Sequence, residues 1–316
     1  MILTISSPDD VHAQAVAEHL NNMGADHRIV DLSKYPSAGS LTVEIDGPGE
    51  QRTRLRDGDR CIDLGAVGAI WWRRPQPYGL HDSMVDPVSR NFALHEVHEA
   101  FTGAWLSLDA AWVNHPTSDE DAGRKVRQLV LAQRIGLRIP RTVVTSDPGV
   151  ASAFIESCGV GSTIYKPFQG SEEAWRETRL VRADELDQLD SVAHAPLIFQ
   201  EYVEAAADLR ITAVDGDLFA ARIETPSSGY QVDFRMEMGG VSISPYELPA
   251  RIESLLATLM RELNIVYGAI DMRLTLDGDL VFLEVNPAGQ WLFVEDETGQ
   301  PIAKRLACCL LERDGG

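Results

Sequence analysis

At the start of the chain, segments with the hydrophobic pattern of a strand alternate with a segment that has the pattern of a helix. Met1–Ile5 is an apolar, β-branched run of the kind found in buried strands. Residues 11–23 carry apolar side chains at helical spacing and end at Gly24, a residue that commonly terminates helices. Residues 28–32 return to a strand pattern. This order of strand, helix and strand favours a parallel sheet with a right-handed crossover, so we predict an α/β fold class for this part.

The same patterns continue to Asn114-His115-Pro116, which we predict to be a domain boundary. Before it, we expect strands at 41–45, 60–62, 69–72 and 111–113 and a long helix over 88–108. After it, we expect a helix capped by Ser118, running to Arg134 and ended by Gly136. The remaining predicted elements are strands at 142–145, 162–166, 178–181, 196–203, 209–214 and 218–224, helices at 148–157, 249–263 and 301–311, and a hairpin over 268–285.

The charge of the chain restricts its partners. Forty-eight acidic against 28 basic residues give a formal net charge of −20 in 316 residues. Such a field repels phosphates, so we expect no nucleic-acid or membrane partner, and an anionic ligand would need locally placed cations. The sequence has no apolar run of about 20 residues and no signal-peptide layout, and its four cysteines form no C-x-x-C pair. We therefore predict a cytoplasmic protein.

The predicted hairpin is the most informative segment. Asp277-Gly278 between alternating apolar runs is typical of a tight hairpin turn. With this turn, Asp271 lies opposite Glu284, and Asn286 follows on the same face. The other face is apolar and is predicted to be core: Ile270, Met272, Leu274, Val281, Leu283 and Val285.

Two interpretations of the polar face remain open. Two carboxylates and an amide oxygen suit Mg²⁺, which typically takes one or two carboxylates together with substrate phosphates. Alternatively, Arg273 is a diagonal neighbour of Glu284 and neutralises it in an ion pair of little energetic value.

Several residues occur in an order that resembles the ATP-grasp superfamily, from Lys125 to the C-terminus. They are Lys166 at the end of a strand, Gln200-Glu201-Tyr202-Val203, Asp208-Leu209-Arg210, Asp271 and Glu284-Val285-Asn286-Pro287. A closer resemblance, to the graspetide (microviridin-type) ribosomal-peptide macrocyclases with MvdD-like domains, spans almost the whole chain. Its marks are Trp71-Trp72-Arg73-Arg74-Pro75, Asp233-Phe234-Arg235 and the segment from Glu284 to Trp291.

The resemblance implies a fold and a division of the chain. It implies an α/β, Rossmann-like pre-ATP-grasp domain over residues 1–114. A two-subdomain α+β ATP-grasp fold would follow over 115–316, with subdomains at 115–199 and 200–316.

The resemblance also implies a role for each candidate residue. Lys125 and Lys166 would contact the phosphates of ATP, and they are two of only four lysines among 28 basic residues. The implied roles of the others are adenine contact for Gln200, Glu201, Tyr202 and Val203, ribose contact for Asp208, Mg²⁺ binding for Asp271, Glu284 and Asn286, and catalysis for Arg210 and Arg235. The alternatives are a buried edge strand at Gln200 and a salt bridge from the arginines to Asp208 or Asp233.

The implied reaction is ATP- and Mg²⁺-dependent activation of a carboxylate as an acyl phosphate. Acidic side chains of a precursor peptide, made of a leader and a core, would be joined to Ser or Thr hydroxyls or Lys amines by a homodimeric enzyme. The alternative enzyme is a free-standing carboxylate–amine ligase acting on a small molecule or a protein terminus. The alternative outside enzymes is a nucleotide-binding regulatory protein.

Overall fold

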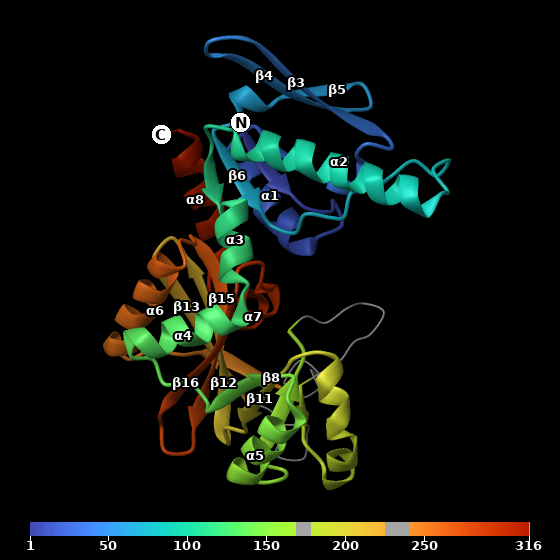
Figure 1. Ribbon diagram of the computed structural model, residues 1–316. Coiled ribbons are helices and arrows are strands. Elements are labelled where there is room, and N and C mark those ends of the chain that lie inside the picture. The colour runs from blue at the N-terminus through green and yellow to red at the C-terminus, as the bar shows by residue number, and fades with distance from the viewer. Residues whose placement is uncertain (169–177, 225–240, 316) are drawn as a thin grey trace.

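The computed structural model describes residues 1–168, 178–224 and 241–315. Its first sheet has the order β2–β1–β6–β7 and is parallel throughout, which confirms the prediction (Figure 1). The strands are β1 (Ile2–Ile5), β2 (His27–Val30), β6 (Ala69–Trp72) and β7 (Ala111–Val113). Trp71 faces α1 (Val11–Asn22), whereas Trp72 packs on the opposite side near Trp105 of α2 (Pro87–Leu106).

A small antiparallel sheet lies beside this unit in the order β3–β4–β5. Its strands are β3 (Gly39–Gly47), β4 (Glu50–Asp57) and β5 (Arg60–Asp63), and the short 3₁₀ turns η1 (Leu32–Lys34) and η2 (Leu64–Ala66) flank it. Strand β4 was not predicted. Its buried Thr53 and Leu55 alternate with three arginines, so the hydrophobic signal of the strand is weak.

The helix predicted from Ser118 to Arg134 is wrong as a single element. It is two helices, α3 (Pro116–Ala122) and α4 (Lys125–Ile135), separated at Gly123 and Arg124. Helix α3 begins earlier than predicted because His115 caps it and Pro116 fills its first turn, where a missing N–H costs nothing. Gly136 ends α4 in a left-handed conformation, as predicted.

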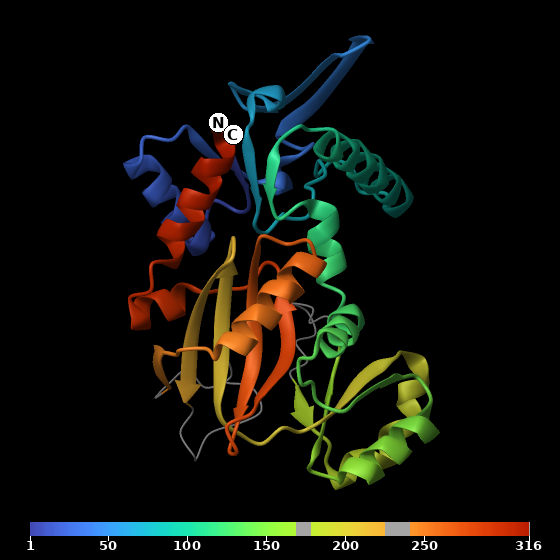
Figure 2. The same cartoon turned by 90° about the vertical axis from the view of Figure 1, so that its left-hand side faces the viewer.

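Two further antiparallel sheets form the rest of the molecule (Figures 1 and 2). The smaller has the order β10–β9–β11–β8, built from β8 (Thr142–Thr145), β9 (Thr163–Lys166), β10 (Arg179–Leu180) and β11 (Leu197–Glu201), with α5 (Pro148–Cys158) and η3 (Ala183–His194). The large sheet has the order β14–β13–β12–β15–β16, built from β12 (Ala205–Val214), β13 (Asp217–Glu224), β14 (Ser242–Pro245), β15 (Tyr267–Thr275) and β16 (Leu280–Asn286). Helices α4 and α6 (Ala250–Glu262) cover the apolar face of the large sheet.

The hairpin of β15 and β16 keeps the predicted pairing of Asp271 with Glu284. Beyond this pair a bulge shifts the register by one residue, so that Met272 lies opposite Phe282 and Leu283 is the extra residue. The predicted pairing of Val281 and Leu283 with the apolar face of β15 is therefore wrong: Val281 is buried as predicted but lies opposite Arg273, and Leu283 is only partly buried. The core takes Leu280, Phe282 and Val285 from β16.

The last helix, α8 (Ile302–Asp314), joins the two ends of the chain. Leu306 and Leu310 pack in one buried cluster with Ile2 and Trp71, next to α7 (Leu292–Thr298), a helix that was not predicted. The N-terminal ammonium lies 2.8 Å from an oxygen of Asp314, and both termini meet at one side of the first sheet (Figure 2). The N-terminal unit and the large sheet therefore share a core. No helix in the described ranges has the length and apolarity needed to span a bilayer.

Asp119 on α3 carries a partly buried carboxyl group. Burial raises its pKa to about 6, although the Asn114 amide 3.3 Å from its Oδ1 and the charge of Arg73 both lower it. The folded-state pKa thus lies above the ordinary value of 3.8. The stabilising contribution of this group is complete below the ordinary pKa and is lost as the pH rises through the folded-state pKa.

Replacing Asp119 with asparagine should therefore stabilise the fold near neutral pH but not near pH 4. A shift of about two units corresponds to at most ~3 kcal/mol of unfolding free energy. Urea unfolding of variant and wild type from pH 4 to pH 7 measures the difference. Asp109→Asn, at an exposed side chain, is the control. A stability difference for Asp119→Asn that stays constant across this range would contradict burial as its source.

Candidate active site

The face of the large sheet opposite its apolar core carries two cross-strand ion pairs. Strands β12 and β15 pair Asp208 with Arg273 and Arg210 with Asp271. The Arg273 Nε lies 3.0 Å from the Asp208 Oδ1, and the Arg210 Nη1 lies 2.5 Å from the Asp271 Oδ1. All four side chains are at least four-fifths buried, so the pairs are shielded from solvent screening. Arg210 therefore contacts a predicted metal ligand, and the predicted alternative of a bridge to Asp208 is wrong.

Helix α4 brings a third ion pair to this face. The Lys125 Nζ lies 2.6 Å from the Glu284 Oε2. The helix is held along the outer edge of β16 by Gln128, whose buried side chain exchanges two hydrogen bonds with the Val285 backbone. Glu284 and Asp271 lie directly opposite each other, and repulsion between their like charges destabilises this pairing. The cations of Lys125 and Arg210 offset that repulsion.

Arg273 is held away from the role that the sequence suggested for it. Its Nε donates to Asp208, its Nη1 donates to the Val203 carbonyl at 2.7 Å, and its guanidinium carbon lies 5.2 Å from the centre of the Tyr202 ring. Arg273 therefore joins Asp208 to the Tyr202–Val203 connection, both of which were predicted to contact nucleotide.

The residues present fit a magnesium ion. Asp271, Glu284 and Asn286 present three oxygen donors at one end of the hairpin, because Asn286 is two residues beyond Glu284 on the same strand. Asn286 has an exposed side chain whose Oδ1 accepts the Ala288 N–H at 3.0 Å. Within the described ranges, no group of three or more His, Cys, Asp or Glu side chains could hold a metal alone. Two carboxylates and an amide instead suit an ion that also binds substrate phosphates.

Gln200 on β11 has a buried side chain with one unpaired acceptor, which suits a residue that hydrogen-bonds a ligand. Its side chain is buried and its Nε2 donates to the Thr142 hydroxyl at 2.9 Å. Its Oε1 is buried and has no hydrogen-bond partner among the residues that the structure describes. A buried acceptor left unpaired costs free energy comparable to a lost hydrogen bond. The amino group of an adenine would supply the missing donor.

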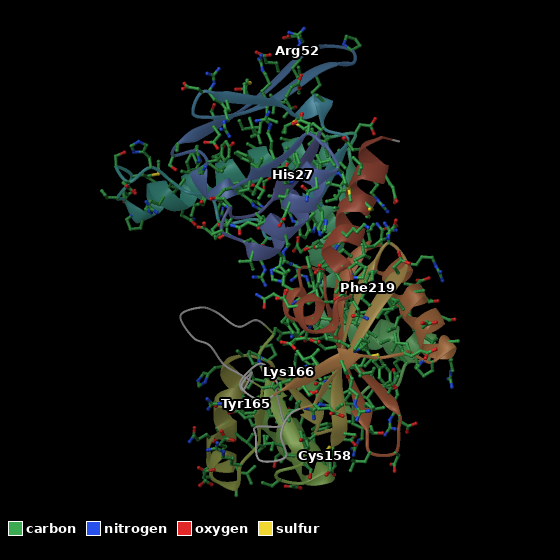
Figure 3. All side chains as sticks on the ribbon, turned by 180° about the vertical axis from the view of Figure 1, so that it is seen from behind. His27, Arg52, Cys158, Tyr165, Lys166 and Phe219 are labelled. Carbon is green, nitrogen blue, oxygen red and sulfur yellow. The ribbon has the colours of Figure 1, made fainter. Side chains whose placement is uncertain are left out.

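The backbone N–H groups of the two residues after Gln200 already donate hydrogen bonds within the protein. The Glu201 N–H donates to the Arg141 carbonyl at 2.9 Å, and the Tyr202 N–H donates to the Ser162 carbonyl at 2.9 Å. These amides therefore hold the connection to the smaller sheet. Lys166 lies at the end of β9 nearer the large sheet (Figure 3). Arg235 lies outside the residues that the structure describes.

The segment between β16 and α7 connects the metal-ligand residues to Arg210. The Arg210 Nε and Nη2 donate to the Gln290 carbonyl at 3.2 and 3.0 Å. The Tyr267 hydroxyl donates to the Gly289 carbonyl at 2.6 Å. Burial raises the pKa of Tyr267, which keeps its hydroxyl protonated as a donor, although nearby arginines lower it. No pattern in the sequence indicated this role for Tyr267, which has the features of an ordinary strand residue.

Comparison with family models divides the chain into two parts. Residues 1–120 match the MvdD pre-ATP grasp domain, and residues 122–310 match the RimK-like ATP-grasp domain.

Curated proteins match about three-fifths of the chain. The chain is 26% identical over 201 residues to a probable alpha-L-glutamate ligase of Enterobacter sp. (strain 638). It is 27% identical over 205 residues to a ribosomal protein bS6–L-glutamate ligase of Salmonella paratyphi B. Each match covers 61% of this chain, and the chain spans 65% of the length of these relatives.

Solved structures match along nearly the whole chain. One is macrocyclase MdnC bound with precursor peptide MdnA from Microcystis aeruginosa MRC, at 29% identity and a TM-score of 0.86, covering 98% of this chain and 99% of that one. Another is a RiPP-associated ATP-grasp ligase of Chryseobacterium gregarium in complex with ADP and a leader and core peptide. It has 27% identity and a TM-score of 0.89, covering 99% and 96%. The predicted fold class, a Rossmann-like domain followed by an ATP-grasp fold, is confirmed.

Proposed function

The chain belongs to the RimK-like ATP-grasp family, and on this premise we propose that it macrocyclises a ribosomally made precursor peptide. The observation that carries the proposal is the full-length similarity to two peptide-bound ATP-grasp enzymes, at 27% and 29% identity. The MvdD pre-ATP grasp match over the first 120 residues supports it. The curated glutamate ligases match 61% of the chain, so they support the ligase chemistry and not the substrate.

The proposed reaction has two steps. A carboxylate oxygen of an Asp or Glu side chain in the peptide attacks the γ-phosphorus of ATP, and the bond from that phosphorus to the bridging oxygen of ADP breaks. A Ser or Thr hydroxyl, or a Lys amine, then attacks the acyl carbon of the resulting acyl phosphate. The carbon–oxygen bond to phosphate breaks, the nucleophile loses its proton, and an ester or amide remains.

The residues of this chain would bind and orient the reactants. We propose that Lys125 and Lys166 hold phosphate oxygens, that Gln200 and the segment from Glu201 to Val203 contact adenine, and that Asp208 contacts ribose. Asp271, Glu284 and Asn286 would hold Mg²⁺, which supplies charge neutralisation on the transferring phosphoryl group. Arg210 and Arg235 would stabilise the same charge from the protein side.

The ion pairs of the site support this assignment. In the structure, Lys125 is balanced by Glu284 and Arg210 by Asp271. With nucleotide, the carboxylates would turn to the metal and the cations to the phosphates, so each side chain exchanges one charged partner for another. An anionic ligand can thus bind locally although the whole chain is strongly acidic.

Three finer features belong to the proposal. We propose that residues 1–114 form the pre-ATP-grasp domain and residues 115–316 the ATP-grasp domain, with subdomains meeting at residues 199 and 200. We also propose that the enzyme acts as a cytoplasmic homodimer. Its leader-binding surface, or the arginines of the site, would compensate the repulsion between an acidic enzyme and an acidic core peptide.

Reconstitution with a candidate precursor peptide, sought among short reading frames next to the gene of this chain, tests the proposal. With ATP and Mg²⁺, the peptide should lose the mass of one water for each crosslink, and ADP and phosphate should appear in equal amounts. Addition of free amino acids to a protein terminus, with no loss from the peptide, would identify the alternative carboxylate–amine ligase. Nucleotide binding without turnover of either substrate would instead identify a regulatory protein.

A further inference from the structure

The segment from Pro287 to Trp291, which we term the anchor loop, follows directly after Asn286. Its backbone oxygens are bonded by four side chains from distant parts of the chain, one of them the Tyr267 hydroxyl already described. The Pro287 carbonyl lies 3.4 Å from the Asn114 amide nitrogen, and the Gln290 carbonyl accepts from Arg210. Ala288 and Gly289 carbonyls both accept from the Nη1 of Arg73, at 2.7 and 2.8 Å. Such complete bonding of a connecting segment indicates one fixed conformation.

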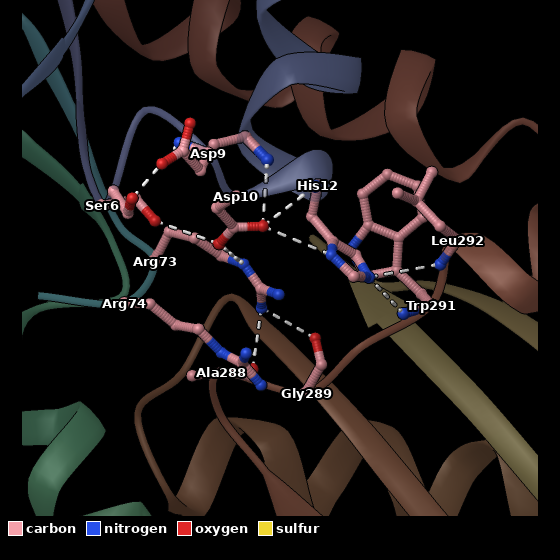
Figure 4. Close-up of polar contacts among 12 residues, drawn as sticks. Ser6, Asp9, Asp10, His12, Arg73, Arg74, Ala288, Gly289, Trp291 and Leu292 are labelled. Carbon is pink, nitrogen blue, oxygen red and sulfur yellow. Dashed lines mark hydrogen bonds and ion pairs between the residues drawn. The ribbon is translucent and has the colours of Figure 1, made fainter.

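Arg73 comes from the N-terminal unit, 215 residues before its nearest partner in the anchor loop. It is fully buried and its guanidinium carbon lies 5.7 Å from the centre of the Trp71 ring. Its Nε donates to the Asp10 Oδ2 at 3.1 Å, and the same oxygen accepts from the Ser6 hydroxyl at 3.0 Å (Figure 4). The guanidinium is therefore fixed on one side by a carboxylate and directs its other side at two carbonyls.

His12 contacts the C-terminal end of the anchor loop. It lies in the first turn of α1, which Asp10 caps. Its Nε2 accepts the Trp291 N–H at 3.1 Å, with the Leu292 N–H 3.4 Å away, and its ring packs edge-on against Trp291 (Figure 4). The His12 Nδ1 lies 3.3 Å from the Asp10 Oδ1. Asp10 thus orients both Arg73 and His12, because each of its oxygens contacts one of them.

The anchor loop has little room to move toward the sheet. A Cβ added to Gly289 would lie 2.2 Å from the Cβ of Ala269, the residue that pairs with Asn286 across the hairpin. The loop therefore presses on the strand that carries Asp271. A displacement of the loop would shift Asn286 at one end and release Arg210 from the Gln290 carbonyl at the other.

We infer that Arg73 is a positioning residue, which sets the anchor loop and through it the metal ligand Asn286 and the side chain of Arg210. This inference rests on the proposed function, because it assigns Arg73 a task in the proposed magnesium site. Arg73 contacts neither of the two residues directly. The pre-ATP-grasp part of the chain would thus contribute to the metal site of the ATP-grasp part.

Metal binding without the peptide tests the inference. Arg73→Lys keeps the charge but lacks the planar fork that bonds two carbonyls and Asp10 together. Mn²⁺, used as the probe, is titrated into the full-length protein with saturating ADP and followed by electron paramagnetic resonance. We expect the Mn²⁺ dissociation constant to rise about tenfold, the low end of the range for residues that orient metal ligands. Affinity for metal-free ADP should change less than about twofold, because Gln200 and its neighbours lie on other elements.

Two further variants keep the result interpretable. Arg52→Lys, at an exposed arginine of β4, should leave both constants unchanged. Tyr267→Phe removes the hydroxyl bond to Gly289 with almost no change in volume, and it decides the question if Arg73→Lys does not fold. Unchanged Mn²⁺ binding in the folded variants would overturn the inference, as would an equal loss of metal and metal-free ADP binding. Because no peptide is needed, failure to form crosslinks would count against the proposed function alone.

Discussion

Replacing Glu284 by glutamine is expected to lower turnover about 10³-fold, which corresponds to ~4 kcal/mol of transition-state stabilisation. Glu284 lies directly opposite Asp271, and these are the two carboxylates that we propose as ligands of Mg²⁺. Glutamine keeps the shape and an oxygen but removes the negative charge. Steady-state phosphate release as a function of Mg²⁺ concentration measures the effect. The lost activity should be recovered in part by high Mg²⁺, because the weakened site still has Asp271 and Asn286.

Asp279→Asn is a matched control on the same hairpin. Asp279 is largely exposed and pairs with Arg138, at the turn end and away from the metal ligands. An exposed ion pair contributes at most about 1 kcal/mol, so its loss should leave turnover within about twofold of wild type. If Glu284→Gln behaved like this control at every Mg²⁺ concentration, Glu284 would be only the ion-pair partner of Lys125. The metal assignment would then be wrong.

The hairpin shows how far local sequence patterns reach. The alternation around Asp277-Gly278 placed Asp271 opposite Glu284, but this pair is correct because two departures cancel. The turn shifts the register by one residue, with Leu274 opposite Leu280, and the bulge at Leu283 restores it. The alternation could not reveal the bulge at Leu283, since an extra residue leaves no composition signal in a run of apolar side chains. The functional end of the hairpin was therefore predicted correctly, and the core face toward the turn was not.

The ion pairs mark a second limit. Glu284 and Lys125 are 159 residues apart, and their contact depends on how α4 packs along the edge of β16. The sequence identified both residues through the family resemblance but not the bond between them. One of its two interpretations of the polar face paired Arg273 with Glu284, because a diagonal neighbour on the hairpin was visible and the neighbouring strand β12 with Asp208 was not.

The anchor loop marks a third limit. Arg73 and Trp291 both occur in segments that carry the family resemblance, yet no spacing rule connects residues more than 200 positions apart. Only the shared core of α1, α8 and the first sheet brings Asp10, His12 and Arg73 against the loop. Buried polar contacts of this kind depend on tertiary packing, and a single sequence carries no signal for them.

Replacing Arg210 by lysine is expected to reduce kcat about 10³-fold, the lower end of the effect of arginines that stabilise a transferring phosphoryl group. Lysine can keep the charge beside Asp271, but it cannot also reproduce the two bonds from Nε and Nη2 to the Gln290 carbonyl. The KM for ATP should change little, because Arg210 acts on charge that develops during transfer and the adenine contacts lie on β11. Single-turnover phosphate release with saturating peptide isolates the chemical step.

Arg273→Lys is the control for Arg210→Lys, because the two arginines occupy equivalent places. Each is buried, lies on the same sheet face and pairs with a carboxylate across β12 and β15. Since Arg273 holds Asp208 and Val203, its lysine variant should raise the KM for ATP more than it lowers kcat. Equal kinetic profiles for the two variants, together with equal losses of thermal stability, would contradict a role in phosphoryl transfer for Arg210. A selective loss of kcat in Arg210→Lys alone separates an arginine that acts on the reacting phosphoryl group from one that shapes the nucleotide pocket.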